Sequence, residues 1–304
     1  IVLSIVTAIP AAVAAIYSEW YSLAGFLLSG FLIFMVGSEL YERFNKADDP
    51  QYKHVLIIVA SGWLAATVFG SLPFFITAII TPPQVMTRFI PEGAQYSVSS
   101  LLYFKNPLHC FFESMSAYTT TGLSMAVHEP SIGKGLLFYR SFAQWIGGAG
   151  FVVTALAVFK NISGGSALLL YGSESTGIKL LPQIKQTTKA IWKVYVLLTA
   201  FSAIYLMIGT KIILPHYPLQ ENIFDSVNHA MAGQSTGGFS TLDDSIATYN
   251  SVKMDILYLL PMIIGSFSLP FFYKVIFERK YNEIWKDIQT SSLIIAFITG
   301  SAIQ

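Results

Sequence analysis

The chain has 304 residues, of which 54% are hydrophobic and 12% are charged, with 23 Phe, 16 Tyr and a mean hydropathy of +0.58. Soluble domains carry about 25% charged residues, so this composition indicates an integral membrane protein. The formal net charge of +1 implies no nucleic-acid partner. The single cysteine, Cys110, excludes an intrachain disulfide and a cysteine-based metal site, and we expect it to pack as a small apolar residue.

Residues 1–53 predict a two-helix hairpin followed by a cytoplasmic linker. Residues 1–18 carry no charge, and residues 20–38 form a second apolar run with Trp20 and Tyr21 as interfacial anchors. A cleaved signal peptide is the alternative for the first run, although no basic leader or small-residue cleavage site is evident. Because the sequence begins at Ile1 rather than Met, we expect further residues before it.

Residues 54–160 predict a first unit made of a helix, a polar loop and a second helix. The charge-free run at residues 55–80 is long enough to cross a bilayer with tilt, at about 1.5 Å of rise per residue. Prolines and scattered polar residues predict an exposed loop over residues 81–105. The second helix is expected over residues 135–159.

Between these helices lies a stretch, residues 106–124, that is too polar to cross a bilayer on its own. Asn106 can cap a helix and Pro107 suits its first position, so we expect a short helix to about Tyr118. Helix propensity then falls over four residues, Thr119, Thr120, Thr121 and Gly122. Such a segment suits a cation filter, because the helix C-terminus is partially negative and the following carbonyls can replace a cation's water.

The same pattern recurs 116 positions further on, at residues 222–240. Aligning NPLHCFFESMSAYTTTGLS with NIFDSVNHAMAGQSTGGFS pairs Met115 with Met231 and Gly122 with Gly238. The counterparts of the four filter candidates are Ser235, Thr236, Gly237 and Gly238. Either loop alone fits an ordinary turn equally well, but a duplicated loop between apolar helices indicates a repeated functional unit.

The second unit, residues 194–276, follows a linker at residues 161–193. Its outer helix is predicted over residues 194–210, its polar loop over 221–240 and its inner helix over 256–273. Residues 277–304 predict a further linker and the start of a third outer helix. Two units cannot close a four-fold pore, so we expect either a longer natural chain, which we favour, or the pairing of two chains.

Three basic linkers predict the orientation in the membrane. Residues 39–53, 160–193 and 274–287 hold twelve of the 18 Lys and Arg. All three lie on the cytoplasmic side, as the positive-inside rule requires, only if both polar loops enter and leave from the opposite side. The loops are therefore predicted to be re-entrant from outside.

Polar residues near the loops have more than one interpretation. Glu113 either braces the first short helix from behind, which we favour, or binds the ion directly. His229 takes its place in the second loop, so we expect His229 and Asn228 to tie that loop to neighbouring helices. Asp243 and Asp244 either concentrate cations at the mouth or form a solvated turn.

The predicted helix over residues 135–159 carries Arg140 and a small-residue cluster, Gly147, Gly148, Ala149 and Gly150. A membrane arginine is costly, so we expect Arg140 to reach the interface or to pair with a loop carboxylate, with a direct role in permeation as the weaker alternative. The cluster either packs closely on another helix, which we favour, or keeps the helix thin beside a conduction path.

The segments SAYTTTGLS, NHAMAGQSTGGFS and RSFAQWIGGAGF resemble those of the Trk/Ktr/HKT superfamily of potassium transporters. The two apolar helices before the first unit are similar to the bacterial TrkH branch, and the resemblance covers essentially the whole chain. It implies an all-α integral membrane protein of the bacterial inner membrane, with two N-terminal helices followed by repeated helix–re-entrant pore loop–helix units.

The function that this resemblance implies is K⁺ uptake through a carbonyl-lined, channel-like pore, without an ATPase, an enzymatic activity or a cofactor other than the transported ion. The implied partners are membrane lipids, a cytosolic ring of TrkA-like nucleotide-binding regulatory subunits and a second copy in a homodimer. The ring would dock on the linkers at residues 160–193 and 274–287, whose simpler role is to set topology and meet anionic headgroups.

Two other functions remain as alternatives. A K⁺-channel filter of the TVGYG type has a second Gly two positions after the first, where this chain has Ser124 and Ser240. This difference predicts a shorter filter with looser selectivity and argues against a two-pore-domain K⁺ channel. A non-conducting membrane scaffold is the second alternative.

Overall fold

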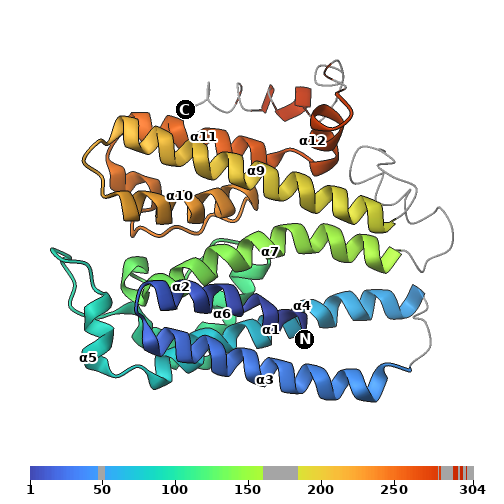
Figure 1. Cartoon of the computed structure of the whole chain (residues 1–304), viewed down its shortest axis with the longest axis horizontal. Coiled ribbons are helices and arrows are strands. Elements are labelled where there is room, and N and C mark those ends of the chain that lie inside the picture. Colours follow the sequence, from blue (N-terminus) through green and yellow to red (C-terminus); the bar gives the residue numbers. More distant parts are fainter. Residues whose placement is uncertain are drawn as a thin grey trace.

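The computed structural model describes residues 1–46, 52–159 and 184–279, with a few positions between 281 and 299. In this part of the chain the regular elements are all helices. They run roughly parallel in two groups, α1–α7 and α9–α12, which meet where α7 lies beside α9 and α10 (Figure 1). Much of the predicted linker at 160–193, and most of residues 277–304, fall outside the described residues.

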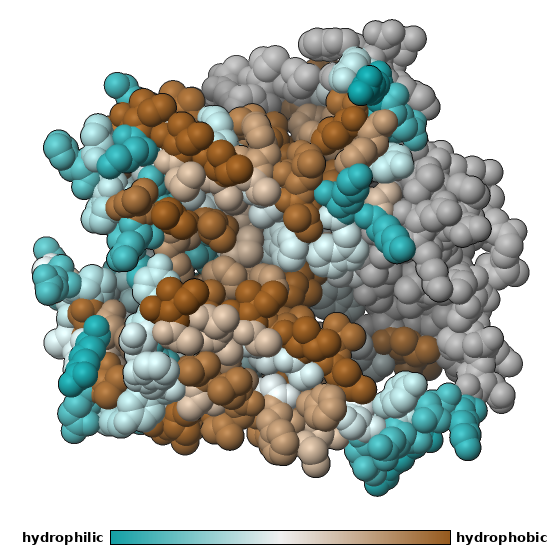
Figure 2. All heavy atoms as spheres, viewed as in Figure 1, coloured by the Kyte–Doolittle hydropathy of each residue, from teal (hydrophilic) through white to brown (hydrophobic). Residues whose placement is uncertain are grey.

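Three of the described helices are long and apolar enough to cross a membrane, namely Trp20–Phe44, Ala60–Ile80 and Lys189–Ile213. They expose large apolar side chains, such as those of Phe31 and Ile204. Figure 2 shows apolar groups over much of one face, with hydrophilic groups gathered towards its edges. An apolar exterior around helices whose backbone bonds are internal is what a bilayer requires.

The N-terminal hairpin comprises α1 (Val2–Val6), α2 (Ala8–Ile16) and α3 (Trp20–Phe44). The first uncharged run, residues 1–18, is divided at Thr7, and Val2–Ile16 is shorter than the ~20 residues that a spanning helix needs. α3 continues past its predicted end at residue 38 into the charged segment. Arg43 pairs there with Glu39 one turn earlier, at 2.6 Å, which supports the extra helix.

The first unit contains the elements α4 (Tyr52–Ile80), α5 (Pro83–Met86), η1 (Thr87–Phe89), η2 (Ser100–Lys105), α6 (Pro107–Tyr118), η3 (Glu129–Ile132) and α7 (Lys134–Phe159). The prediction of an exposed loop over residues 81–105 is wrong at its end, residues 99–105. There Leu101 and Phe104 are completely buried, because η2 packs against α4 and α6.

The second unit contains α9 (Ile184–Ile213), α10 (Leu219–Gln234), η4 (Ser245–Tyr249), α11 (Val252–Ser266) and α12 (Leu269–Ile276). Its outer helix begins earlier than the predicted residue 194. The single inner helix predicted over residues 256–273 is wrong, because Phe267 and Ser268 are extended between α11 and α12. Pro270 lies in the first turn of α12, where proline is tolerated, and it could not continue α11 without breaking a hydrogen bond.

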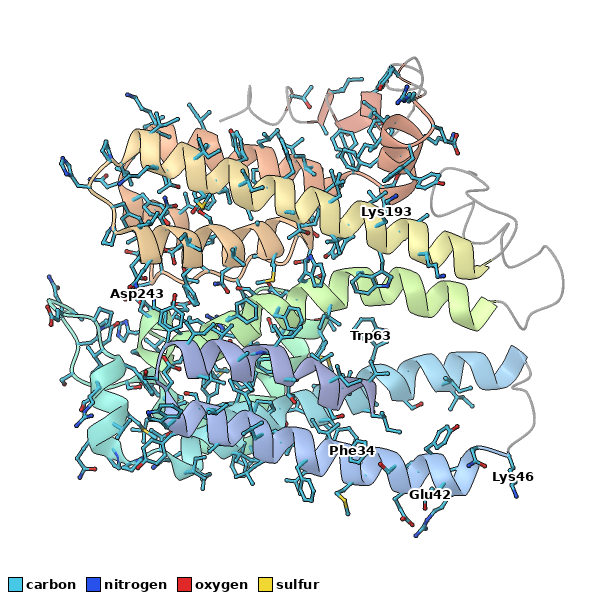
Figure 3. All side chains as sticks on the ribbon, viewed as in Figure 1. Phe34, Glu42, Lys46, Trp63, Lys193 and Asp243 are labelled. Carbon is cyan, nitrogen blue, oxygen red and sulfur yellow. The ribbon has the colours of Figure 1, made fainter. Side chains whose placement is uncertain are left out.

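The helix ends fall at two opposite ends of the molecule. α3 and α7 finish at the right-hand end in Figure 1, where α4 and α9 begin, whereas α7, α10 and α11 begin at the left-hand end. Glu42 and Lys46 lie at the first of these ends and Asp243 at the second (Figure 3). The 12 residues of α6 give a helix of about 18 Å, too short for a hydrocarbon core of about 30 Å.

Glu19 anchors the N-terminal hairpin to the first unit. Its carboxylate accepts hydrogen bonds from the backbone N–H groups of Lys134 and Gly135, at 2.5 and 3.0 Å. These are the first residues of α7, and Gly133 before them has no side chain with which to cap the helix. A carboxylate at a helix N-terminus contributes about 0.3–2 kcal/mol, so Glu19 supplies from another element the cap that α7 lacks.

Candidate functional site

The first candidate segment follows directly from the end of α6. The helix begins at Pro107 and ends at Tyr118, as predicted. Beyond it the N–H groups of Thr120 and Thr121 donate to the carbonyls of Ala117 and Ser116, at 3.0 and 2.9 Å. This is a Schellman arrangement, which satisfies carbonyls of the last helical turn and reverses the chain direction.

The second segment repeats these bonds 116 positions later. The N–H groups of Thr236 and Gly237 donate to the carbonyls of Gly233 and Ala232, at 3.1 and 2.8 Å. In both segments the hydroxyl of the residue just after the helix also donates a hydrogen bond to a carbonyl of that helix. Thr119 bonds the Met115 carbonyl at 2.7 Å, and its counterpart does the same at 2.9 Å. The duplication thus extends from the sequence to individual hydrogen bonds.

Backbone conformation alternates in sign along both segments. φ is 54° at Thr120 and 80° at Gly122, and it is 50° at Thr236 and 84° at Gly238. The residue before each threonine has φ of −85° or −86°. Such alternation places successive N–H groups on one side of the chain and carbonyls on the other. A left-handed conformation costs a β-branched threonine about 1–2 kcal/mol, and strain of this kind concentrates at functional sites.

The structure brings the two segments into contact through their glycines. A Cβ built on Gly122 would lie 2.2 Å from the carbonyl oxygen of Gly237 and 3.4 Å from the Cα of Gly238. A Cβ on Gly238 would lie 3.9 Å from the Cα of Gly122. Residues more than a hundred positions apart therefore form one site.

Glu113 braces the first segment from behind, as we favoured. Its buried carboxylate accepts from the Met125 N–H at 2.7 Å, from the Ser124 hydroxyl at 3.1 Å and from Arg140 Nε at 2.7 Å. These bonds tie the middle of α6 to the chain that follows the filter candidates. The ion pair with Arg140 and the bonds from residues 124 and 125 make the carboxylate a structural acceptor.

Arg140 does not reach the interface, contrary to the first of our two expectations. It is completely buried, with the loop carboxylate of Glu129 at 3.9 Å and the closer partner, Glu113, on α6. Its Nη1 donates to the Ser240 carbonyl at 3.2 Å, and its guanidinium lies 4.2 Å from the centre of the Phe239 ring. A buried cation persists when it is paired in this way, and here the pairing joins the two loops.

The second loop replaces the charged pair by a neutral one. His229, the counterpart of Glu113, contacts the Ser240 hydroxyl through Nε2 at 3.0 Å and the Tyr258 hydroxyl through Nδ1 at 3.3 Å. Tyr258 occupies the same position, counted from the start of the helix, in α11 as Arg140 does in α7. His229 therefore ties its loop to a neighbouring helix, as predicted.

Two other polar residues donate hydrogen bonds to backbone carbonyls a few residues earlier in the chain. Asn228 donates to the Phe224 carbonyl of its own helix at 2.7 Å, so the expectation that it ties α10 to a neighbour is wrong. Cys110 is buried as expected, and its thiol donates to the Phe104 carbonyl at 2.9 Å.

Acidic residues lie where the two loops approach the end of the molecule. Asp243 is 3.7 Å from Nδ1 of His128, whose ring stacks on Tyr96. Burial raises the pKa of Glu129 to about 7, against the opposing effect of Arg140, and burial also raises the pKa of Asp243. Within the described residues no group of three or more His, Cys, Asp or Glu is placed to hold a metal ion.

Gln144 belongs to this site, although sequence reasoning did not select it. Its amide Nε2 donates to the Gly237 carbonyl at 2.8 Å, and its Oε1 accepts from the Phe239 N–H at 3.2 Å. The available signal was its position one turn after Arg140, which places both side chains on the same face of α7.

The small-residue cluster of α7 packs against the site. A Cβ on Gly147 would lie 2.0 Å from the Tyr118 carbonyl oxygen of α6, and one on Gly148 would lie 2.9 Å from the Cβ of Ser235. Close packing on a helix is therefore confirmed for Gly147. Gly150 differs, because no atom of the described residues lies within 4 Å of its Cβ position.

This difference predicts opposite effects of two alanine substitutions. Gly147→Ala should lower the unfolding temperature of the purified protein, because overpacking costs about 1–3 kcal/mol. Gly150→Ala should leave it unchanged or raise it, since alanine is favoured in a helix by about 1 kcal/mol. Thermal unfolding in detergent measures both, and equal unfolding temperatures would contradict the packing described for Gly147.

Long apolar helices around a duplicated, strained polar segment define an all-helical, multi-pass membrane protein. Residues 24–299 match the family model of TrkH, a cation transport protein. The chain therefore belongs to the TrkH family, within the superfamily that the sequence motifs resemble. This is a family of transport proteins and not of enzymes.

Curated relatives and a solved structure agree with this assignment. The chain is 29% identical over 300 residues to an uncharacterized cation transporter of Methanocaldococcus jannaschii, covering 98% of this chain and 54% of the relative. It is 29% identical over 285 residues to the Trk system potassium uptake protein TrkH of Escherichia coli K12, covering 92% of this chain and 52% of the relative. The chain thus spans about half the length of the curated relatives it matches.

The crystal structure of the potassium transporter TrkH from Vibrio parahaemolyticus matches with a TM-score of 0.73 and 25% sequence identity. The match covers 98% of this chain and 54% of that chain. The all-helical membrane fold expected from the sequence is confirmed by this similarity.

Proposed function

We propose that this chain forms part of a K⁺ uptake pathway whose selectivity filter includes the two paired segments. The observation that carries the proposal is a left-handed backbone conformation at a threonine and, two residues later, at a glycine. It occurs in both segments, and the two segments are in contact. Carbonyls turned to one side of such a segment can replace the water around a cation. The relatives named as potassium uptake proteins supply the choice of ion.

The proposed filter residues are Thr119, Thr120, Thr121 and Gly122 of the first segment, and Ser235, Thr236, Gly237 and Gly238 of the second. Backbone carbonyls of these segments would coordinate K⁺, which is the transported substrate, except the Gly237 carbonyl, which accepts from Gln144 Nε2 at 2.8 Å. The Thr119 and Ser235 hydroxyls already bond their helices, which leaves coordination mainly to the backbone. Ser124 and Ser240 stand where a K⁺-channel filter has its second glycine, so we infer a short filter of modest selectivity.

Both loops are proposed to be re-entrant from the outer side of the plasma membrane. α4 ends and α7 begins at the same end of the molecule, which supports a first loop that does not cross (Figure 1). Lys46 at the opposite end fits the positive-inside rule, with Asp243 at the outer mouth.

The whole protein is proposed to complete the pathway around these segments. A four-fold pore needs four of them, whether from further repeats or from a second chain. We also propose the unit boundaries at residues 54–160 and 194–276. The proposed partners are membrane lipids, a second copy in a homodimer and a TrkA-like cytosolic ring. Flux would follow the electrochemical gradient or a coupled ion.

The test is ⁸⁶Rb⁺ uptake into proteoliposomes that contain the complete protein, with K⁺ or Na⁺ as competitor. Uptake above that of empty liposomes, inhibited more by K⁺ than by Na⁺, is the expected result. No uptake from folded, correctly inserted protein would favour a non-conducting scaffold, and sharp selectivity typical of a K⁺ channel would favour the two-pore-domain alternative.

A further inference from the structure

We propose that Gln144 is a positioning residue that holds the Gly237 peptide of the second segment and thereby sets the ion preference of the pathway. The inference rests on the proposed function and deepens it, because it assigns selectivity to a side chain that touches no ion. It predicts that the first inner helix controls the filter segment of the following unit.

The carboxamide of Gln144 is completely buried and uses both of its polar atoms on one short stretch of backbone. Nε2 donates to the Gly237 carbonyl at 2.8 Å, and Oε1 accepts from the Phe239 N–H at 3.2 Å. One turn earlier on α7, Arg140 donates to the Ser240 carbonyl at 3.2 Å. Three hydrogen bonds from α7 thus hold residues 237–240, and two of them come from Gln144.

The sequence difference between the two segments supports this role. Position 237 is glycine, whereas its counterpart in the first segment is Thr121. Gly237 is not among the residues with positive φ, so its backbone conformation does not require glycine. A Cβ there would lie 2.3 Å from Oε1 and 2.4 Å from Cδ of Gln144. Glycine is needed because the Gln144 amide occupies the space of a side chain.

Among the described residues, α11 of the second unit has no equivalent donor. Gly147 of α7 faces the last turn of α6, and Gly265 of α11 faces the last turn of α10 in the same way. A Cβ built on Gly265 would lie 2.1 Å from the Gly233 carbonyl oxygen. This register aligns the two inner helices with an offset of 118 and places Met262 opposite Gln144. A thioether cannot donate a hydrogen bond. Of the two inner helices that the structure describes, only α7 therefore carries this clamp.

Removing the amide would leave a buried carbonyl and a buried N–H without this partner. Each such group costs about 1–3 kcal/mol, which is enough to favour a different orientation of the peptide. Because Gly122 also packs against the Gly237 carbonyl, such a rotation would disturb both segments. Ion ranking should change more than folding.

The experiment compares Gln144→Met, which installs the residue found opposite in α11, with Gln144→Glu in the complete protein. Gln144→Glu keeps the acceptor for Phe239 but, once ionised, has no proton to donate and places an oxygen against the Gly237 carbonyl, so its ion ranking is measured at a pH where the carboxyl is ionised. Ser141→Ala is the matched control, because Ser141 is buried on the same helix and its hydroxyl has no partner among the described residues. ⁸⁶Rb⁺ uptake with competing K⁺ or Na⁺ is normalised to folded protein in proteoliposomes.

Gln144→Met and Gln144→Glu should each reduce the preference for K⁺ over Na⁺ by about tenfold, the factor that corresponds to 1.4 kcal/mol. Ser141→Ala should keep the native ranking. Native ranking in either Gln144 variant, while Gly122→Ser alters it, would overturn the inference and leave the proposed filter intact. Native ranking in the Gly122→Ser protein as well would overturn the filter itself. If Gln144→Met does not fold, the nearly isosteric Gln144→Glu decides.

Discussion

Gly122→Ser is expected to abolish selective K⁺ uptake while folded protein still reaches the membrane. The new Cβ would lie 2.2 Å from the Gly237 carbonyl oxygen, so the second segment has to move. The φ of 80° adds about 1–2 kcal/mol of strain for any residue other than glycine. Gly238→Ser has the strain of a φ of 84° without the clash, since its nearest neighbour is at 3.9 Å. It should lower K⁺ over Na⁺ selectivity and retain some uptake.

Gly93→Ser provides the matched control for both variants. Gly93 has a φ of 82° and no atom of the described residues within 4 Å of its Cβ position, and it lies in the loop before η2. The backbone strain is the same, but the residue is outside the site, so ion ranking should be native. ⁸⁶Rb⁺ uptake against competing K⁺ and Na⁺ separates the three variants. Native uptake and ranking in both the Gly122 and Gly238 variants would show that these loops are not the filter.

Arg140→Met is expected to produce the largest loss of stability of any single change considered for this chain. It would leave the Glu113 carboxylate buried without its cation, and breaking a buried pair in this way costs about 3–5 kcal/mol. The Ser240 carbonyl would also lose a donor. Chemical or thermal unfolding of the purified protein measures the loss. Adding Glu113→Gln should recover part of it, because the unpaired charge is removed.

The neutral pair of the second loop offers a sharper comparison. Combining Glu113→His with Arg140→Tyr would transplant the His229–Tyr258 pair into the first loop. The double variant should be more stable than Arg140→Tyr alone, and the cycle isolates the coupling between the two positions. Additive effects of the two substitutions would contradict the pairing, and so would an Arg140→Met protein that unfolds like the parent.

Local signals in the sequence determined the membrane class and the two short helices. The N-cap of α6 is an example, because Asn106 accepts from the Leu108 N–H at 3.0 Å and Pro107 follows it as expected. The end of α6 at Tyr118 could also be predicted from the sequence, because the run of threonines and a glycine that follows lowers helix propensity within a few residues. The duplication at an offset of 116 located both candidate segments without any knowledge of the fold.

Tertiary structure alone decided which side chains support those segments. Arg140 is separated by a hundred positions from Ser240, and Gln144 by more than ninety from Gly237, so no local pattern names either partner. The roles of Gly147 and Gly150 also diverge only once α6 has packed against one of them. Capping and periodicity act over one or two turns, whereas a buried donor takes its acceptor from whichever chain the packing brings within about 3 Å.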